Sequence, residues 1–131
     1  MGDSDRTEKI TINLGLVDLG QIDLLVQEGF YTNRTDFIRN AIRTQLATRA
    51  ETLNQTAVRR TLTLGSCLYT RGDLEAVRSA GEMLHIRVLG LASIAEDVSP
   101  ELARATIASV EVLGAFRAPG AVKAILSDRT A

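Results

Sequence analysis

The chain has 131 residues, of which 45% are hydrophobic, so it can form one ordinary domain or two small ones that gain stability by oligomerisation. Only 4% of the residues are aromatic and there is no Trp, which argues against a large aromatic-lined pocket. The net charge is −1, and residues 1–50 carry six basic and seven acidic side chains. Bulk charge therefore gives no support for nucleic-acid binding, which has to be argued from individual positions.

Cellular location is constrained by what the sequence lacks. Cys67 is the single cysteine, so no internal disulfide forms, and the first nine residues are charged where a secretory signal needs an apolar run. No window of about 20 apolar residues is present, so no membrane span is expected. These features predict a cytoplasmic protein with no membrane association.

The first expected element is a short strand over residues 9–14. Its apolar and polar residues alternate, which is typical of a strand with one buried face. The apolar set is Ile10, Ile12 and Leu14, and the polar set is Lys9, Thr11 and Asn13. A single short strand is not stable alone. This strand therefore needs a partner that the following sequence, which is helical, does not supply.

Two helices are expected next. The first runs from about Leu16 to Glu28 and ends at Gly29, a residue suited to the left-handed position that follows a helix. The second begins near Thr32 and Asn33, where a polar N-cap is followed by Asp36, whose carboxylate can accept from free backbone amides. Its apolar face consists of Phe37, Ile38, Ala41, Ile42 and Leu46.

A strand, a helix, a glycine turn, a polar cap and a second helix within about 40 residues resemble the ribbon-helix-helix family of Arc, MetJ and CopG-type repressors. The resemblance covers residues 6–50 and is closest over the segment from Glu28 to Arg39. It implies that the strand pairs antiparallel with its copy in a second subunit, so the chain is expected to form a homodimer. It also assigns DNA binding and dimerisation to residues 1–50.

The resemblance further implies which residues contact double-stranded DNA. The outward strand residues enter the major groove, and the start of the second helix holds a phosphate through its free amides and its positive dipole end. The expected DNA contacts are Lys9, Thr11, Asn13, Asn33, Arg34 and Thr35, with Arg6 adding a phosphate contact from the N-terminal arm. The alternative is that the strand residues form the solvated face of a dimerisation ribbon and that Asn33 and Thr35 are ordinary helix caps.

After a linker over residues 51–60, the sequence contains a threefold repeat. Three strand-like segments each end in glycine, and these glycines are 25 and then 24 positions apart. The segments are 61–65, 86–90 and 110–114. Helices are expected over 73–80, 99–108 and 121–127, with Asp73 and Ser99 as N-caps and Pro100 at the first helical position.

The repeat predicts the fold and role of residues 61–131. One strand and one helix in about 24 residues match a coil of a small β/α solenoid, so the whole chain is expected to be α+β, with a compact non-solenoid domain as the alternative. No polar capping coil follows the third strand, so its edge at Val110 to Leu113 is expected to be open. We expect this part to act in assembly, giving tetramers through a two-fold contact or filaments through a head-to-tail contact.

Catalysis is not expected, because one His, one Cys, no phosphate-binding glycine loop and no metal-ligand spacing leave few groups that could converge. His85 is interpreted as a turn or surface residue and Cys67 as a small buried hydrophobe. No cofactor, metal or small-molecule ligand is expected. The favoured function is a sequence-specific transcriptional regulator, with repression as the expected effect. The alternatives are a self-assembling scaffold and, less favoured because of the patterned C-terminal half, an antitoxin.

Overall fold

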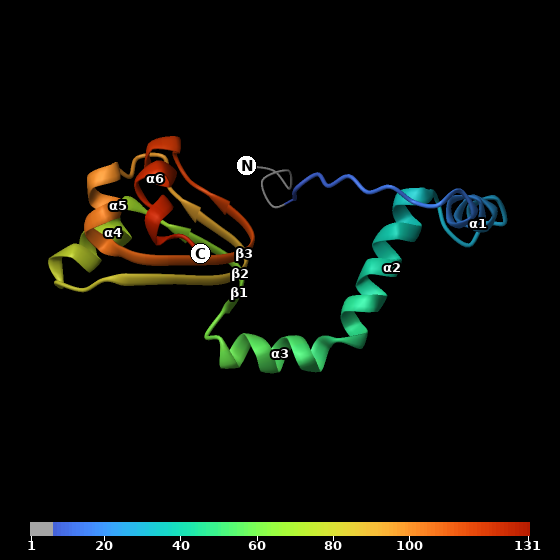
Figure 1. Cartoon of the computed structure of the whole chain (residues 1–131), viewed down its shortest axis with the longest axis horizontal. Helices are drawn as coiled ribbons and strands as arrows, with labels where there is room; N and C mark the ends of the chain where they lie inside the picture. Colours follow the sequence, from blue (N-terminus) through green and yellow to red (C-terminus); the bar gives the residue numbers. More distant parts are fainter. Residues whose placement is uncertain (1–6) are drawn as a thin grey trace. The chain divides into compact units, whose positions relative to one another are not determined.

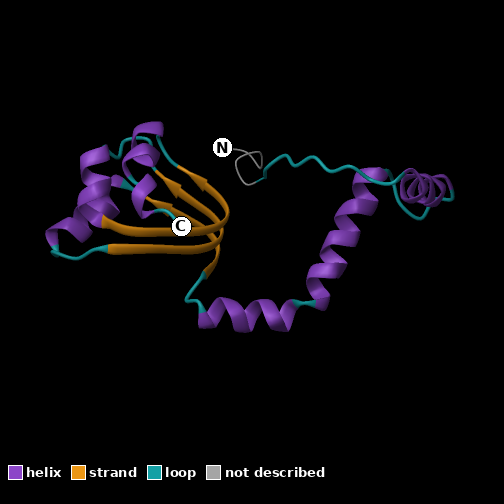
Figure 2. Ribbon diagram, in the orientation of Figure 1, coloured by secondary structure: helices purple, strands orange, loops and turns teal. Residues whose placement is uncertain are grey.

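The computed structural model describes residues 7–131, and the chain divides into two compact units that meet between Thr56 and Ala57 (Figure 1). The first unit contains helices α1 (Leu16–Gln27) and α2 (Arg34–Thr48). Helix α3 (Ala50–Arg59) spans the boundary and forms most of the segment expected as a linker. The described chain is α+β (Figure 2).

Residues 7–15, which include the expected strand, form no regular element in the single chain. Ile10 and Ile12 have exposed fractions of 73% and 59%, although their alternation with polar residues predicts a buried face. A strand needs a hydrogen-bonded neighbour, and no other segment among the described residues pairs with this one. The strand expected over 9–14 is therefore absent from the isolated chain for lack of a partner.

The first helix runs nearly as expected, and the second begins where expected. Gly29 has φ of +84° directly after α1, and the side chain of Asn33 caps α2. The rings of Tyr31 and Phe37 meet edge to face, with centroids 5.0 Å apart. However, Ile22 is the one residue of this unit that is buried, within the part that the structure describes. The apolar face of α2 is at least partly exposed, so this unit has a small core of its own.

The second unit alternates strands and helices. Its strands are β1 (Thr63–Tyr69), β2 (Leu84–Ile94) and β3 (Ile107–Arg117), and its helices are α4 (Arg71–Ser79), α5 (Pro100–Thr106), α6 (Gly120–Ile125) and the short 3₁₀ turn η2 (Ser127–Arg129). The strands form one parallel sheet in the order β1-β2-β3. Helices α4 and α5 lie in the connections between successive strands, and α6 and η2 follow the last strand.

The register of the sheet reproduces the repeat in the sequence. Gly65 pairs with Gly90, and Gly90 pairs with Gly114, so the three glycines form a row across the sheet. Each strand continues for several residues beyond its glycine, so the expected segments 61–65, 86–90 and 110–114 cover only part of each strand. The three glycines have φ values from +119° to +139°, so the backbone departs from an ordinary strand conformation within each strand.

The core of the second unit lies between the helices and one face of the sheet. Along β2, Ile86, Val88, Ala92 and Ile94 are buried and alternate with residues that are only partly covered. The buried set packs with Leu74 of α4, Leu102 of α5 and Val122 of α6. All three helices therefore cover the same face of the sheet, and the other face carries leucines exposed to solvent.

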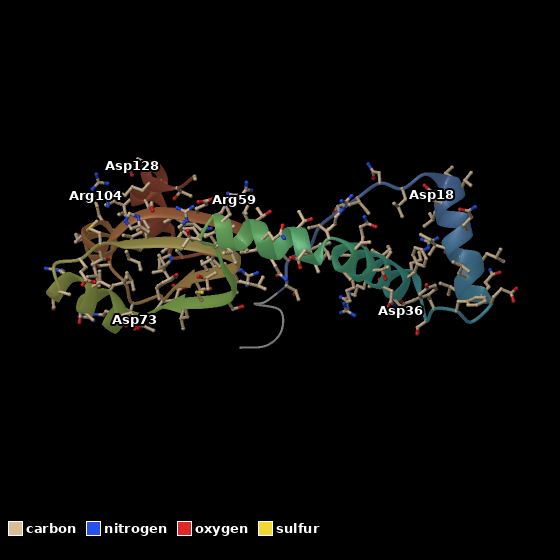
Figure 3. All side chains as sticks on the ribbon, turned by 90° about the horizontal axis from the view of Figure 1, so that it is seen from below. Asp18, Asp36, Arg59, Asp73, Arg104 and Asp128 are labelled. Carbon is tan, nitrogen blue, oxygen red and sulfur yellow. The ribbon has the colours of Figure 1, made fainter. Side chains whose placement is uncertain are left out.

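The N-termini of α4 and α5 are capped by side chains. Ser99 caps α5 and Pro100 occupies the first helical turn, as expected. Asp73 is not an N-cap: Thr70 caps α4, and Asp73 lies three residues later, where its carboxylate completes a capping box (Figure 3). The expected helix start was therefore placed two residues too late.

The sheet is neither closed nor curled, and no solenoid is shown by the described residues; the coarser α+β assignment holds. The outer edge of β3 is not fully open at Val110, contrary to expectation. There Thr130 forms a parallel bridge with Val110, and the N–H of Ala131 donates to the carbonyl of Val110 at 2.9 Å. The other edge of the sheet, along β1, has no neighbouring strand within residues 7–131.

Candidate nucleic-acid interface

The extended segment before α1 presents its expected base-reading residues to solvent. Lys9, Thr11 and Asn13 are all exposed. Among the described residues, no hydrogen bond or ion pair joins these three side chains to the start of α2. No such contact therefore joins the two groups of expected DNA contacts within residues 7–131.

The start of α2 is built by reciprocal capping. The Asn33 side-chain oxygen accepts from the N–H of Asp36 at 2.8 Å, and the Asp36 carboxylate accepts from the N–H of Thr32 at 3.0 Å. Asp36 is labelled in Figure 3, in the first turn of α2. Asn40 also donates to the Asp36 carboxylate at 3.0 Å. These bonds hold the first turn rigid and keep the Asp36 carboxylate directed at neighbouring donors.

Two backbone donors remain at this helix end. The N–H groups of Arg34 and Thr35 make no hydrogen bond within the described part of the chain. They lie at the positive end of a 15-residue helix, where a phosphate oxygen is the preferred acceptor. The roles expected for Arg34 and Thr35 at a phosphate are therefore available through their backbone amides.

The side chain of Arg34 is already paired. Its Nε and Nη2 atoms donate to the two carboxylate oxygens of Asp23 in α1, at 2.7 and 2.8 Å. The hydrogen bond lowers the pKa of Asp23, and the same bond raises the pKa of Arg34, so both groups stay charged at neutral pH. Asp23 was not identified from the sequence, because it lies eleven positions before Arg34 and only the turn between the helices brings the two together.

The remaining expected DNA contact, Arg6, lies outside the described residues. No cluster of three or more His, Cys, Asp or Glu side chains that could hold a metal is found between residues 7 and 131. No helix of that region is long and apolar enough to cross a membrane.

Comparison with known families decides what this arrangement represents. The sequence profile of the Ribbon-Helix-Helix transcriptional regulator family matches residues 5–123. The chain belongs to this family. As a ribbon-helix-helix protein it is a DNA-binding transcriptional regulator of a non-enzymatic class, and such proteins typically act as dimers. It matches no curated protein and no solved structure.

The extent of the match corrects one expectation. The resemblance was expected over residues 6–50 alone, but the family profile continues through the parallel sheet to residue 123. The β/α unit is therefore part of what defines this ribbon-helix-helix family, and it is not an unrelated domain attached to a common DNA-binding module.

Proposed function

We propose that this protein is a repressor whose dimeric ribbon reads a short DNA half-site, and whose second unit links dimers on DNA in the cytoplasm. Residues 1–50 bind DNA and dimerise, residues 51–60 connect the parts, and residues 61–131 assemble. The observation that carries the proposal is the exposed alternating segment 9–14, which has an apolar side without cover and a polar side suited to base edges.

The apolar side supports dimerisation. Pairing with a second copy covers Ile10, Ile12 and the exposed residues of α2, such as Ile42 and Leu46, which the single chain leaves in water. An obligate dimer is the ordinary solution for a unit this poor in buried residues.

The polar side supports base reading. In the paired ribbon, Lys9, Thr11 and Asn13 lie on the face opposite the apolar residues and offer ammonium, hydroxyl and amide groups to the major groove. The free N–H groups of Arg34 and Thr35 then hold a backbone phosphate beside the ribbon. Since one of the three ribbon residues is charged, a single dimer is expected to bind weakly.

The experiment is fluorescence anisotropy of the full chain on DNA from upstream of its own gene and on a random duplex, at two salt concentrations. A Lys9→Ala/Thr11→Ala/Asn13→Ala variant should lose the preference for the upstream DNA. Arg78→Ala, which removes one positive charge from an exposed position of α4, is the matched control and should bind like the parent chain. Equal binding of both duplexes by the parent chain refutes base reading by the ribbon.

A scaffold is the second candidate, because the uncovered edge of β1 is suited to self-association independently of DNA. It predicts assembly of the free protein and no preference between the two duplexes. The same anisotropy experiment, with sedimentation of the free protein, separates the two functions.

A further inference from the structure

The two outer edges of the parallel sheet complement each other. β2 and β3 each have 11 residues, whereas β1 has seven and begins at Thr63, which pairs with Val88. On the opposite edge, the end of the chain pairs with β3 at Val110, the residue in register with Ile86. The end of the chain therefore lies level with the part of the sheet that precedes the start of β1. Beyond it, residues 112–117 of β3 are level with six of the seven residues of β1.

The contacts along the row of glycines indicate at which edge of the sheet a further strand would fit. A Cβ atom on Gly114 would lie well inside 3.0 Å of the Gly90 carbonyl oxygen, and one on Gly90 would lie equally close to the Gly65 carbonyl oxygen. Each strand therefore approaches its predecessor closely at glycine. Gly65 has the same kind of backbone, with φ of +126°, but nothing lies within 4 Å of its Cβ position. Gly65 lacks this close contact because β1 is the first strand of the sheet and no strand precedes it.

The backbone of β1 has hydrogen-bonding groups directed away from the sheet. The carbonyl of Tyr69 accepts from the N–H of Ala95, and the Gly65 carbonyl is directed at Gly90, so these residues face the β2 side. Since backbone groups alternate in direction along a strand, those of Leu64, Ser66 and Leu68 face outward. The side chains of Leu64 and Leu68 are 74% and 57% exposed, so the edge presents both polar backbone and apolar side chains.

We propose that β1 of one chain pairs with the outer edge of β3 of a second copy, parallel and in register, with Gly65 beside Gly114 of that copy. This contact would repeat the pairing that joins β1 to β2 and β2 to β3, and it would place Leu64 beside Leu113 of the second copy, extending the row of Leu64, Leu89 and Leu113. It is a head-to-tail contact, so it propagates from copy to copy. It specifies the assembly role proposed above and rests on it.

The partner that we propose for these two sheet edges is a second copy of the same chain. One edge-to-edge contact is small compared with the roughly 1,200–2,000 Å² that a stable interface buries. The proposed ribbon dimer carries two sheets. After one sheet-edge contact forms between two dimers, the next sheet-edge contact is intramolecular and forms at an effective concentration in the millimolar range. Weak contacts between neighbouring dimers on tandem half-sites then reinforce one another.

Disulfide trapping tests the register. The full chain with Cys67→Ala, Ser66→Cys and Ala115→Cys should form covalent dimers and longer multimers on oxidation, because Ser66 would lie beside Ala115 of the second copy. Within one chain these residues are two strands apart, about 10 Å, too far for a disulfide. Cys67→Ala with Ser66→Cys alone should give no covalent product. The head-to-tail pairing is overturned if the chain with both new cysteines forms no multimers, or if the chain with Ser66→Cys alone forms covalent dimers.

A glycine substitution gives an independent test by sedimentation velocity at micromolar concentration. Gly65→Ala should abolish assembly beyond the ribbon dimer, because its Cβ atom would collide with the carbonyl of Gly114 of the second copy. Gly81→Ala is the matched control, since Gly81 also has positive φ and an empty Cβ position but lies in the turn after α4. A parent chain that stays a strict dimer, or a Gly65→Ala chain that assembles like the control, contradicts the proposal. Anisotropy on a duplex with one operator site reports DNA binding separately, so loss of assembly is distinguished from loss of the ribbon.

Discussion

Substituting the middle glycine of the row, Gly90→Ala, should destabilise the second unit strongly. The backbone there has φ of +139°, a conformation that costs a residue with a side chain about 1–3 kcal/mol. The new Cβ atom would also lie 3.1 Å from the Gly65 carbonyl carbon and closer still to its oxygen. Relieving that overlap separates β1 from β2 and weakens hydrogen bonds worth about 1 kcal/mol each. We therefore expect a loss of about 3 kcal/mol or more.

Thermal unfolding followed by circular dichroism measures this loss, and hydrogen exchange of β2 peptides locates it. For a domain of 60–100 residues, about 3 kcal/mol corresponds to a midpoint roughly 12–24 °C lower. Gly72→Ala is the control, because the Cβ position in α4 meets only the Thr70 hydroxyl at 3.9 Å, and alanine favours a helix. If both variants melt at the same temperature, the close approach of the strands does not constrain Gly90.

Three further perturbations test the first unit and the capping of α4. Ile12→Asp should prevent ribbon pairing, leaving a monomer in sedimentation that does not bind DNA, whereas Thr11→Ala should remain dimeric and lose only base preference. Asp23→Asn should release Arg34 to a phosphate, tightening DNA binding and steepening its salt dependence by about 0.9 for each phosphate gained; unchanged slopes would mean that Arg34 does not reach DNA. The Thr70 N–H lowers the pKa of Asp73, so the contribution of this carboxylate to α4 is complete above the ordinary pKa of about 3.9 and disappears as the pH falls through its lower folded value. The protection of α4 amides against hydrogen exchange, measured relative to the intrinsic exchange rate at each pH, should therefore fall in acid more for the parent chain than for Asp73→Asn.

The helices of the first unit were predictable because their signals are local. A cap at Asn33 and a glycine after α1 each act within four residues, and both occur where the sequence places them. The ion pair between Asp23 and Arg34 was not predictable, since it depends on the angle between two helices. The strand over 9–14 was predictable as a pattern, but one chain contains no neighbouring strand for it among residues 7–131, so this strand stays a prediction.

The pairing register of the strands in the second unit was predictable from the sequence, but the lengths of these strands were not. Glycines repeated at nearly constant spacing identified the strands, and the sheet pairs these same glycines. A glycine within a strand weakens it or marks an irregularity, so the repeat located the strands only around their glycines, and the strands run several residues further. They continue because all three strands change conformation at the same level, which preserves the hydrogen bonds between them. This is a cooperative property of the sheet and is not encoded in any one strand.

Weak DNA binding by the proposed ribbon and the open edge of β1 are connected. In the proposed ribbon each strand would offer one charged side chain to DNA, Arg34 is already engaged by Asp23, and the chain carries no excess positive charge. Phosphate neutralisation supplies most of the affinity of an isolated DNA-binding dimer, so this one lacks the usual source of tight binding. Affinity then has to come from several dimers bound side by side, which requires a contact that propagates. The edge of β1 is the contact that we propose. It forms in the free protein at micromolar concentration and is reinforced where tandem half-sites bring dimers together, so occupancy of the DNA would depend on the number of half-sites more than on the affinity of any one.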